Sequence, residues 1–149
     1  MNKLLIIFLI SLSLISCGSQ LPPPNSNSDI MNIIGNTVNI EDIEVTKYDF
    51  PIEMNWYDAK KACESLGEGW RLPSQEELNI LFQNRDKIGG WAFTSGFGYR
   101  SYWSSLEYSG AECYGRPGNE CAFNQYFRSG TGIFTYKKNK HQVRAVRSN

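Results

Sequence analysis

Two helical patterns joined by a very short connection limit the folds open to this chain. Asn55 is a suitable cap for the first helix and Gly67 a suitable stop. The apolar face between them is formed by Ala59, Ala62, Cys63 and Leu66. The second helix begins at Ser74, which has the capping-box spacing with Glu77. Because residues 69–73 are too few for another element, we expect the two helices to pack close together.

The remaining sequence favours short strands. Residues 43–50 predict a strand that ends at Pro51, which has no N–H group to continue a ladder, and residues 30–40 alternate weakly. After Gly89, aromatic and β-branched runs are separated by clusters of Gly, Asn and Ser. These runs predict strands at 102–105, 122–128, 133–137 and 142–147. We expect the last two strands to form a hairpin over residues 138–140.

The first residues have the layout of a signal peptide. The apolar run at residues 4–15 is shorter than the roughly 20 residues that a membrane-spanning helix needs. Residues 14–17 resemble the lipobox of bacterial lipoproteins. We therefore predict that residues 1–16 are removed and that Cys17 carries the lipid that holds the protein at a membrane. The alternative is an ordinary secretory signal.

A tether and one domain follow. Residues 17–29 are rich in Pro, Ser and Asn, so they predict a flexible tether, and residues 30–149 are enough for a single domain. Gly18 and Ser19 stand where some Gram-negative lipoproteins carry the aspartate that retains them in the inner membrane. We therefore expect the chain in the bacterial cell envelope, anchored in the outer membrane.

Three of the four cysteines remain once Cys17 carries lipid, and export brings them into an oxidising compartment. We expect Cys113 and Cys121 to form a disulfide that closes a short loop. Cys63 then remains as a small buried residue of the first helix. A bridge from Cys63 to either of the other two is the alternative.

Five motifs follow one another along the chain. They are Trp56-Tyr57-Asp58-Ala59 with Cys63, Gly69-Trp70-Arg71-Leu72-Pro73-Ser74 with Glu77-Leu78, Tyr102-Trp103-Ser104-Ser105, residues 127–130, and Val143-Arg144-Ala145-Val146-Arg147. In this order they resemble the Lcl C-terminal domain family, a group of bacterial envelope domains related to the C-type-lectin-like and sulfatase-modifying-factor fold. The resemblance spans about residues 55–147.

The resemblance implies an α+β, C-type-lectin-like domain in which two helices pack on a twisted, mainly antiparallel sheet with long loops on one side. Similar proteins are adhesins, carbohydrate binders or proteins without an assigned role, so the fold alone does not fix the ligand. We expect a lipid-anchored, non-catalytic binding or adhesion domain for a glycan, a matrix component or an envelope protein. The alternatives are a structural lipoprotein that binds another envelope protein and an enzyme related to the formylglycine-generating enzymes.

Several motif residues have a structural interpretation. Arg71 lies in a segment that we expect to be buried, so its guanidinium needs a carboxylate, and Glu77 and Asp58 are the nearest in sequence. Trp70 and Trp103 are expected in the core, because large aromatic side chains dominate the cores of small domains.

The loops offer the best candidates for ligand contact. A Gly-rich stretch at residues 96–118 carries Tyr99, Arg100, Tyr108, Tyr114 and Arg116. Aromatic rings stack on the apolar faces of sugars, and arginine offers forked donors to carboxylate or sulfate groups. The alternative is a solvated loop whose tyrosines cover the sheet.

The C-terminal segment is locally basic. It contains Lys137, Lys138, Lys140, His141, Arg144 and Arg147. Such a surface attracts an acidic polysaccharide, but lysines also keep an edge strand from pairing with other chains. We favour the second interpretation.

We expect no catalytic residue, metal or cofactor. His141 is the only histidine, which leaves no zinc-ligand spacing and no convincing serine or cysteine dyad. Cys113 and Cys121 do not reproduce the closely spaced cysteines of formylglycine-generating enzymes, and the Glu-Pro-Asn and Trp-Asn-Asp motifs of calcium-dependent lectins are absent. The formal net charge of +0 argues against a nucleic-acid partner.

Overall fold

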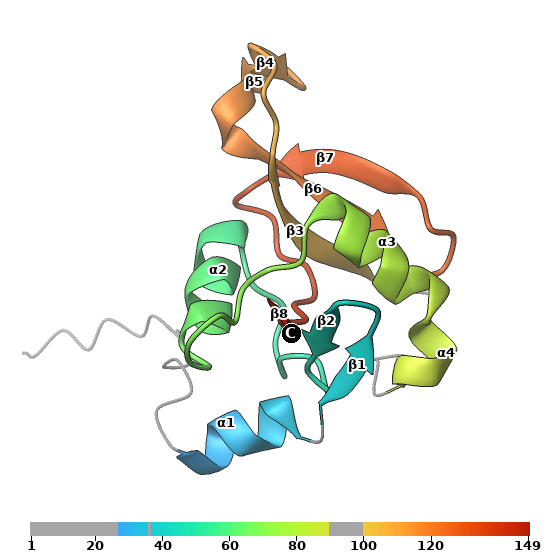
Figure 1. The fold of residues 1–149 in the computed structure, drawn as a ribbon. Helices are drawn as coiled ribbons and strands as arrows, with labels where there is room; N and C mark the ends of the chain where they lie inside the picture. The colour runs from blue at the N-terminus through green and yellow to red at the C-terminus, as the bar shows by residue number, and fades with distance from the viewer. Residues whose placement is uncertain (1–26, 36, 90–99) are drawn as a thin grey trace, which may run out of the picture.

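The computed structural model describes residues 27–35, 37–89 and 100–149 (Figure 1). Cys17, the predicted signal peptide and Tyr99 lie outside the described residues. Within these ranges helices pack against antiparallel sheets, so the predicted α+β class is confirmed. The helices are α1 (Asn27–Ile34), α2 (Trp56–Glu64), α3 (Gln75–Gln83), α4 (Arg85–Ile88) and the 3₁₀ turn η1 (Gly118–Glu120).

Both predicted helix starts are confirmed at the level of single hydrogen bonds. The Asn55 side chain accepts from the Asp58 N–H at 3.0 Å at the start of α2. At the start of α3, the Glu77 N–H donates to Ser74 Oγ at 3.1 Å, and the Ser74 N–H donates to Glu77 Oε2 at 2.7 Å. Local capping chemistry therefore sets both helices.

The helix α1 differs from the expected weak strand at residues 30–40. Ile30, Ile33 and Ile34 have helical spacing, and all three pack against the core beside α2. A helix places residues at i, i+3 and i+4 on one face, which a strand does not. The helix begins at Asn27, so the last residues of the predicted tether are helical.

The smaller sheet has the order β1–β2–β8, with β1 (Val38–Ile40), β2 (Ile43–Val45) and β8 (Val146–Ser148) all antiparallel. The strand predicted at 43–50 is therefore too long. Beyond Val45 the backbone is irregular but stays bonded to the C-terminal segment, because the Phe50 N–H donates to the Val143 carbonyl at 3.0 Å.

The larger sheet has the order β3–β6–β7, with β3 (Ser101–Glu107), β6 (Cys121–Tyr126) and β7 (Gly132–Tyr136). The predicted hairpin over residues 138–140 is wrong. β7 pairs with β6, with Phe134 opposite Phe123, and β8 pairs with β2 in the other sheet. The hairpin turn lies at 127–131, between β6 and β7, and the turn after Tyr136 leads the chain from the larger sheet to the smaller one.

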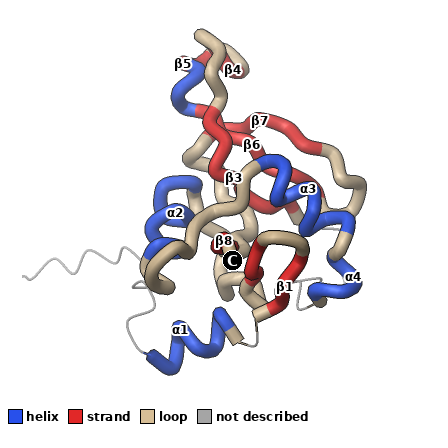
Figure 2. The backbone as a smooth tube through the Cα atoms, in the orientation of Figure 1, coloured by secondary structure: helices blue, strands red, loops and turns tan. Residues whose placement is uncertain are grey.

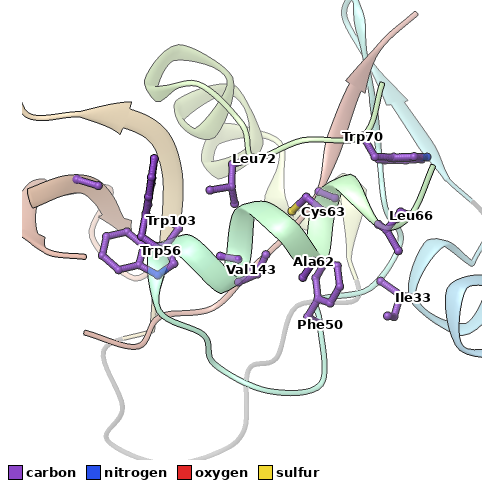
Figure 3. Packing of buried hydrophobic residues seen from close by; sticks show 13 residues of the cluster. Ile33, Phe50, Trp56, Ala62, Cys63, Leu66, Trp70, Leu72, Trp103 and Val143 are labelled. Atoms are coloured by element: carbon purple, nitrogen blue, oxygen red, sulfur yellow. The ribbon is translucent and has the colours of Figure 1, made fainter. Parts of the chain in front are cut away.

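The larger core cluster surrounds α2, as Figure 3 shows. It includes Trp70 and Trp103, which are 4% and 0% exposed, so their predicted place in the core is confirmed. Cys63 is also buried there as a free thiol, as expected. A second cluster, which includes Leu78 and Leu81 of α3, fills the space between that helix, β3 and the smaller sheet.

A short hairpin projects beyond the sheet at one end of the molecule (Figure 2). It consists of β4 (Glu112–Cys113) and β5 (Arg116–Pro117) and is followed by η1. A disulfide between Cys113 and Cys121 joins β4 to the start of β6, which confirms the predicted pairing. The projecting segment is therefore covalently closed at its base.

Candidate ligand-binding site

The tip of the β4–β5 hairpin holds an aromatic residue in an unfavourable backbone conformation. Tyr114 and Gly115 form its two-residue turn, with φ angles of 49° and 75°. Such turns favour Asn-Gly, because a left-handed conformation costs an ordinary L residue about 1–2 kcal/mol. Burial of the Tyr114 side chain does not offset this cost, because the residue is 71% exposed. Strain of this kind gathers at functional sites.

Contacts with β7 hold the hairpin in place. The Tyr136 hydroxyl donates to the Tyr114 carbonyl at 2.6 Å. The Arg116 guanidinium lies over the Tyr136 ring at 4.9 Å from its centroid, and the Tyr114 ring meets the same ring edge-on at 6.3 Å. Together with the disulfide, these contacts pre-organise the tip, which lowers the entropy lost on binding.

A groove of about 190 Å³ opens between this hairpin, α2 and the turn after β7. We call it the aromatic-basic groove, and it is lined by Tyr57, Arg116, Glu120, Tyr136, Lys137, Lys138 and Asn139. Tyr57 is 49% exposed and brings an aromatic ring from α2. The groove thus joins side chains from three segments that are distant in sequence.

The cations of the groove have different roles. Lys137 is 4% exposed; its ammonium bonds to Glu107 and to the Asn119 carbonyl and lies 4.7 Å from the Trp56 ring centroid. It is a structural cation. Lys138 is exposed, and the Arg116 side chain is 56% exposed, with the Glu120 carboxylate 3.7 Å away.

Of the four predicted ligand-contact residues that the structure describes, two come together. Tyr114 and Arg116 share the hairpin, whereas Tyr108 packs edge-on against Phe134 at 4.9 Å. Arg100 precedes β3 at the opposite end of that strand, where its carbonyl accepts from the Phe127 N–H. Tyr99 lies outside the described residues.

Sequence reasoning missed Tyr57 and Tyr136 as parts of the groove, and it named Lys138 only as part of a basic segment. Tyr57 directly follows the buried Trp56 in a helical pattern, and Tyr136 is the last residue of a strand. Neither position carries a local signal for ligand contact. Their assembly depends on how β7 passes α2 and the hairpin.

The C-terminal segment, which is locally basic in sequence, exposes few of its charges. Arg144 is fully buried, and Arg147 donates to the Glu44 carboxylate at 2.5 Å. Lys137 is buried, as described above, and His141 is half-buried. Only the lysines of the turn, Lys138 and Lys140, are exposed among the predicted basic residues. The composition shows the positive charges but not the carboxylates and carbonyls that accept hydrogen bonds from them.

Arg71 has the partner that the sequence suggested. Its guanidinium donates to both carboxylate oxygens of Glu77, at 2.7 and 2.8 Å. The pair is less buried than expected, because the Arg71 side chain is 41% exposed. The hydrogen bonds with Glu77 raise the pKa of Arg71. This ion pair links the connecting segment to α3.

A serine and a histidine do meet in the structure, although no such pair was evident in the sequence. Ser101 Oγ lies 2.6 Å from His141 Nδ1, and Asn124 Nδ2 lies 2.8 Å from His141 Nε2. Burial lowers the pKa of His141 to about 4, against a smaller opposing effect of Glu53. Ser101 is only 3% exposed, so this cluster offers a substrate no access and is a buried polar network.

Residues 27–35, 37–89 and 100–149 contain neither a metal-ligand cluster nor a membrane-spanning helix. No group of three His, Cys, Asp or Glu side chains gathers there in a metal-binding arrangement. None of the helices in these ranges has both the length and the apolar character to span a bilayer.

Comparisons with known proteins agree with this architecture. The family model of the Lcl C-terminal domain matches residues 35–147. Among solved structures, the snake venom toxin convulxin is similar at 12% identity and a TM-score of 0.56, over 77% of this chain and 96% of convulxin. No protein of curated function matches the sequence.

Two further solved structures are similar. EMS16, described as an antagonist of the collagen receptor integrin α2β1, has 12% identity and a TM-score of 0.53, over 76% of this chain and 97% of EMS16. Botrocetin has 16% identity and a TM-score of 0.51, over 76% of this chain and 96% of botrocetin. These likenesses show that the fold is C-type-lectin-like.

Proposed function

The chain belongs to the Lcl C-terminal domain family, and from this premise we propose that it is a non-catalytic binding domain whose ligand docks in the aromatic-basic groove. One observation carries the proposal. Tyr114 keeps a left-handed backbone at the tip of a covalently closed hairpin while the residue stays 71% exposed. The exposed side chain offsets little of the backbone cost by burial, whereas a ligand gains a rigid aromatic contact.

The ligand class follows from the groove's side chains. Arg116 and Lys138 offer exposed positive charge, and Glu120 opposes only part of it. Tyr57 adds an exposed aromatic residue within the groove, and Tyr114 adds another beside it, with its ring centroid 6.3 Å from that of Tyr136. Rings and a forked guanidinium suit an acidic glycan, whose sugar faces stack while its sulfate or carboxylate groups accept hydrogen bonds. We assign this domain an acidic polysaccharide of the surrounding matrix as ligand.

A protein ligand is the second candidate. It is favoured by the fold neighbour EMS16, which is described as an antagonist of an integrin. Tyr and Arg are also the residues that most often anchor protein–protein interfaces. An envelope protein docked through the same groove would make this chain an assembly component.

We also propose that the domain is anchored to the bacterial envelope through a lipid on Cys17, at the outer membrane. The apolar run that ends at Cys17 and the residues Gly18 and Ser19 support this location. Mass spectrometry of the N-terminal peptide from the native host checks the anchor. An acylated Cys17 is expected, and an intact N-terminus at Met1 contradicts the proposal.

Binding is tested with the full-length chain in a detergent without a sugar headgroup, against heparin, alginate and neutral dextran. We expect binding to the two acidic polymers, weakening with salt, and none to dextran. The double variant Arg116→Gln/Lys138→Gln is expected to bind about tenfold more weakly, which corresponds to about 1.4 kcal/mol.

Lys140→Gln is the matched control, because Lys140 is an exposed cation of the same turn that does not line the groove. If Lys140→Gln and the groove variant lost the same amount of polysaccharide affinity, the loss would be explained by net charge alone. That result would refute a site in the groove. A failure of all polysaccharides to bind, together with capture of an envelope protein that depends on Arg116, favours the second candidate.

A further inference from the structure

A second hollow lies away from the groove, between α3 and the turn that joins β6 to β7. It has a volume of about 330 Å³, at the lower end of the roughly 300–1,000 Å³ range of small-ligand sites. We call it the amide cleft, and it is lined by Gln75, Glu76, Asn79, Phe123, Gln125, Gly130 and Gly132. None of these residues lines the aromatic-basic groove.

The chemistry of the amide cleft differs from that of the groove. Three carboxamides and one carboxylate line it, and no lysine or arginine does. Each carboxamide both donates and accepts hydrogen bonds, as a sugar hydroxyl does. The Glu76 carboxylate repels anions and has only a hydrogen bond from Ser74 Oγ, at 2.9 Å, among its described contacts. The lining therefore suits a neutral ligand rich in hydroxyl groups.

Gln125 lines the cleft, and its carbonyl oxygen is an unused hydrogen-bond acceptor. Gln125 is 4% exposed, and its Nε2 donates to the Gly130 carbonyl at 2.9 Å and to Asn79 Oδ1 at 3.4 Å. Its Oε1 is buried and accepts no hydrogen bond from the described residues. Because both contacts of Nε2 are acceptors, turning the amide over would lose them. A buried acceptor without a donor is costly and calls for a partner.

Glycines keep the cleft open. A Cβ on Gly132 would lie 2.0 Å from Cζ of Phe123, and a Cβ on Gly130 would lie 2.6 Å from Cε1 of Phe82. Gly130 also has a φ of 78°, which other L residues rarely adopt. A side chain at Gly132 would displace the Phe123 ring and one at Gly130 the Phe82 ring, so bare backbone forms part of the lining.

We infer that the amide cleft binds a single neutral sugar residue. The carboxamides of Asn79 and Gln75 hydrogen bond to its hydroxyls, the Phe123 ring lines the apolar side, and one hydroxyl donates to Gln125 Oε1 after a small turn of the amide. The site is separate from the proposed groove and does not depend on it. A cell-surface glycan that carries neutral sugars beside acidic ones has the chemistry to engage both sites.

The test is an NMR titration of the full-length chain, in the same detergent, with glucose, galactose, mannose and N-acetylglucosamine. The side-chain NH₂ resonances of Gln125, Asn79 and Gln75 are direct reporters. We expect saturable shifts of these signals with one of the sugars in the millimolar range. Asn79→Ala, a substitution at an exposed position, should weaken that binding about tenfold.

Two variants serve as controls. Gln83→Ala changes an exposed carboxamide of the same helix that does not line the cleft, and Arg116→Gln changes the groove. Both should bind the sugar like the unchanged chain. The inference is overturned by absent or unsaturable shifts, by equal loss in Gln83→Ala, or by loss in Arg116→Gln, which would place the sugar in the groove. Stronger shifts with methylammonium than with any sugar would make the cleft a cation site and overturn it too.

Discussion

Arg144 and Asp49 form an ion pair inside the protein, with 2.5 Å between Nε of Arg144 and Oδ1 of Asp49 and side chains that are 0% and 4% exposed. The Tyr102 hydroxyl donates to the other carboxylate oxygen at 2.7 Å. Burial and the Asp49 charge raise the pKa of Tyr102, so this hydroxyl remains a donor. Arg144 Nη1 also donates to backbone carbonyls, including those of Thr46 and Gly89. The pair therefore links segments that are remote in sequence.

Breaking this pair should destabilise the fold strongly. Arg144→Met and Asp49→Asn each leave one buried group without its partner, and we expect each to lower the free energy of unfolding by about 3–5 kcal/mol. The double variant should lose less than the sum, because neither charge remains. Urea unfolding measures all three. Arg116→Met, at an exposed pair, should lose less than about 1 kcal/mol, and equal losses in the two arginine variants would contradict the prediction.

The parts of the fold that the sequence predicted correctly depend on local chemistry. The Asn55 cap and the Ser74–Glu77 capping box each involve residues three positions apart, so both helices could be located from the sequence. Strand pairing is not local. The short strand at 146–148 pairs with β2 about one hundred residues earlier, and no turn residue signals that choice. The predicted hairpin failed for this reason.

The candidate site divides in the same way. Tyr114 and Arg116 could be predicted because they are close together in a Gly-rich loop. Tyr57 and Tyr136 reach the groove only through the packing of α2 beside the end of β7, which the sequence does not encode locally. Arg144 belongs to one of the family motifs and to the segment predicted to be basic, but neither its burial nor its partner Asp49 was predicted.

His141 should make the free energy of unfolding depend on pH. This dependence should lie at higher pH than the range in which carboxylates titrate. Its pKa is about 4 in the fold, because burial disfavours the charged ring, against about 6.5 unfolded. As pH falls, His141 therefore takes up its proton at a higher pH in the unfolded chain than in the fold. The free energy of unfolding decreases as pH drops from 6.5 toward 4, by at most about 1.4 kcal/mol per pH unit. We expect urea unfolding to show a loss of up to about 2 kcal/mol between pH 7 and pH 5.

His141→Gln isolates this effect, because the chain has no other histidine. The variant should have a nearly flat stability between pH 7 and pH 5, whatever its absolute stability at pH 7. Carboxylates whose pKa is lowered, such as Glu44 beside Arg147, lose their contribution only at more acidic pH. A slope that persists unchanged in His141→Gln would assign the pH dependence to another group.

The disulfide should stabilise both the fold and the groove. The cysteines are 8 residues apart in sequence, and closing so short a loop restricts the unfolded chain by about 2.5 kcal/mol. We expect the double variant Cys113→Ser/Cys121→Ser to lose about this much stability and to exchange the amide hydrogens of residues 112–117 faster. Cys63→Ala is the control for hydrogen exchange, because that thiol is free and buried elsewhere. Unchanged exchange at 112–117 in the double variant would contradict a role in fixing the hairpin.

Replacing Tyr114 should raise stability and lower binding at the same time. Asparagine adopts a left-handed backbone more readily than tyrosine, so Tyr114→Asn is expected to gain up to about 1 kcal/mol in urea unfolding. The loss of the exposed ring should weaken heparin binding about tenfold, which corresponds to about 1.4 kcal/mol.

Glu41→Asn is the matched control, because Glu41 has a φ of 53° in the turn between β1 and β2, away from the groove. That variant should gain stability but bind heparin unchanged. If Tyr114→Asn gained stability and also kept full binding, the strained tip would have no part in ligand contact, and the exposed ring would need another explanation.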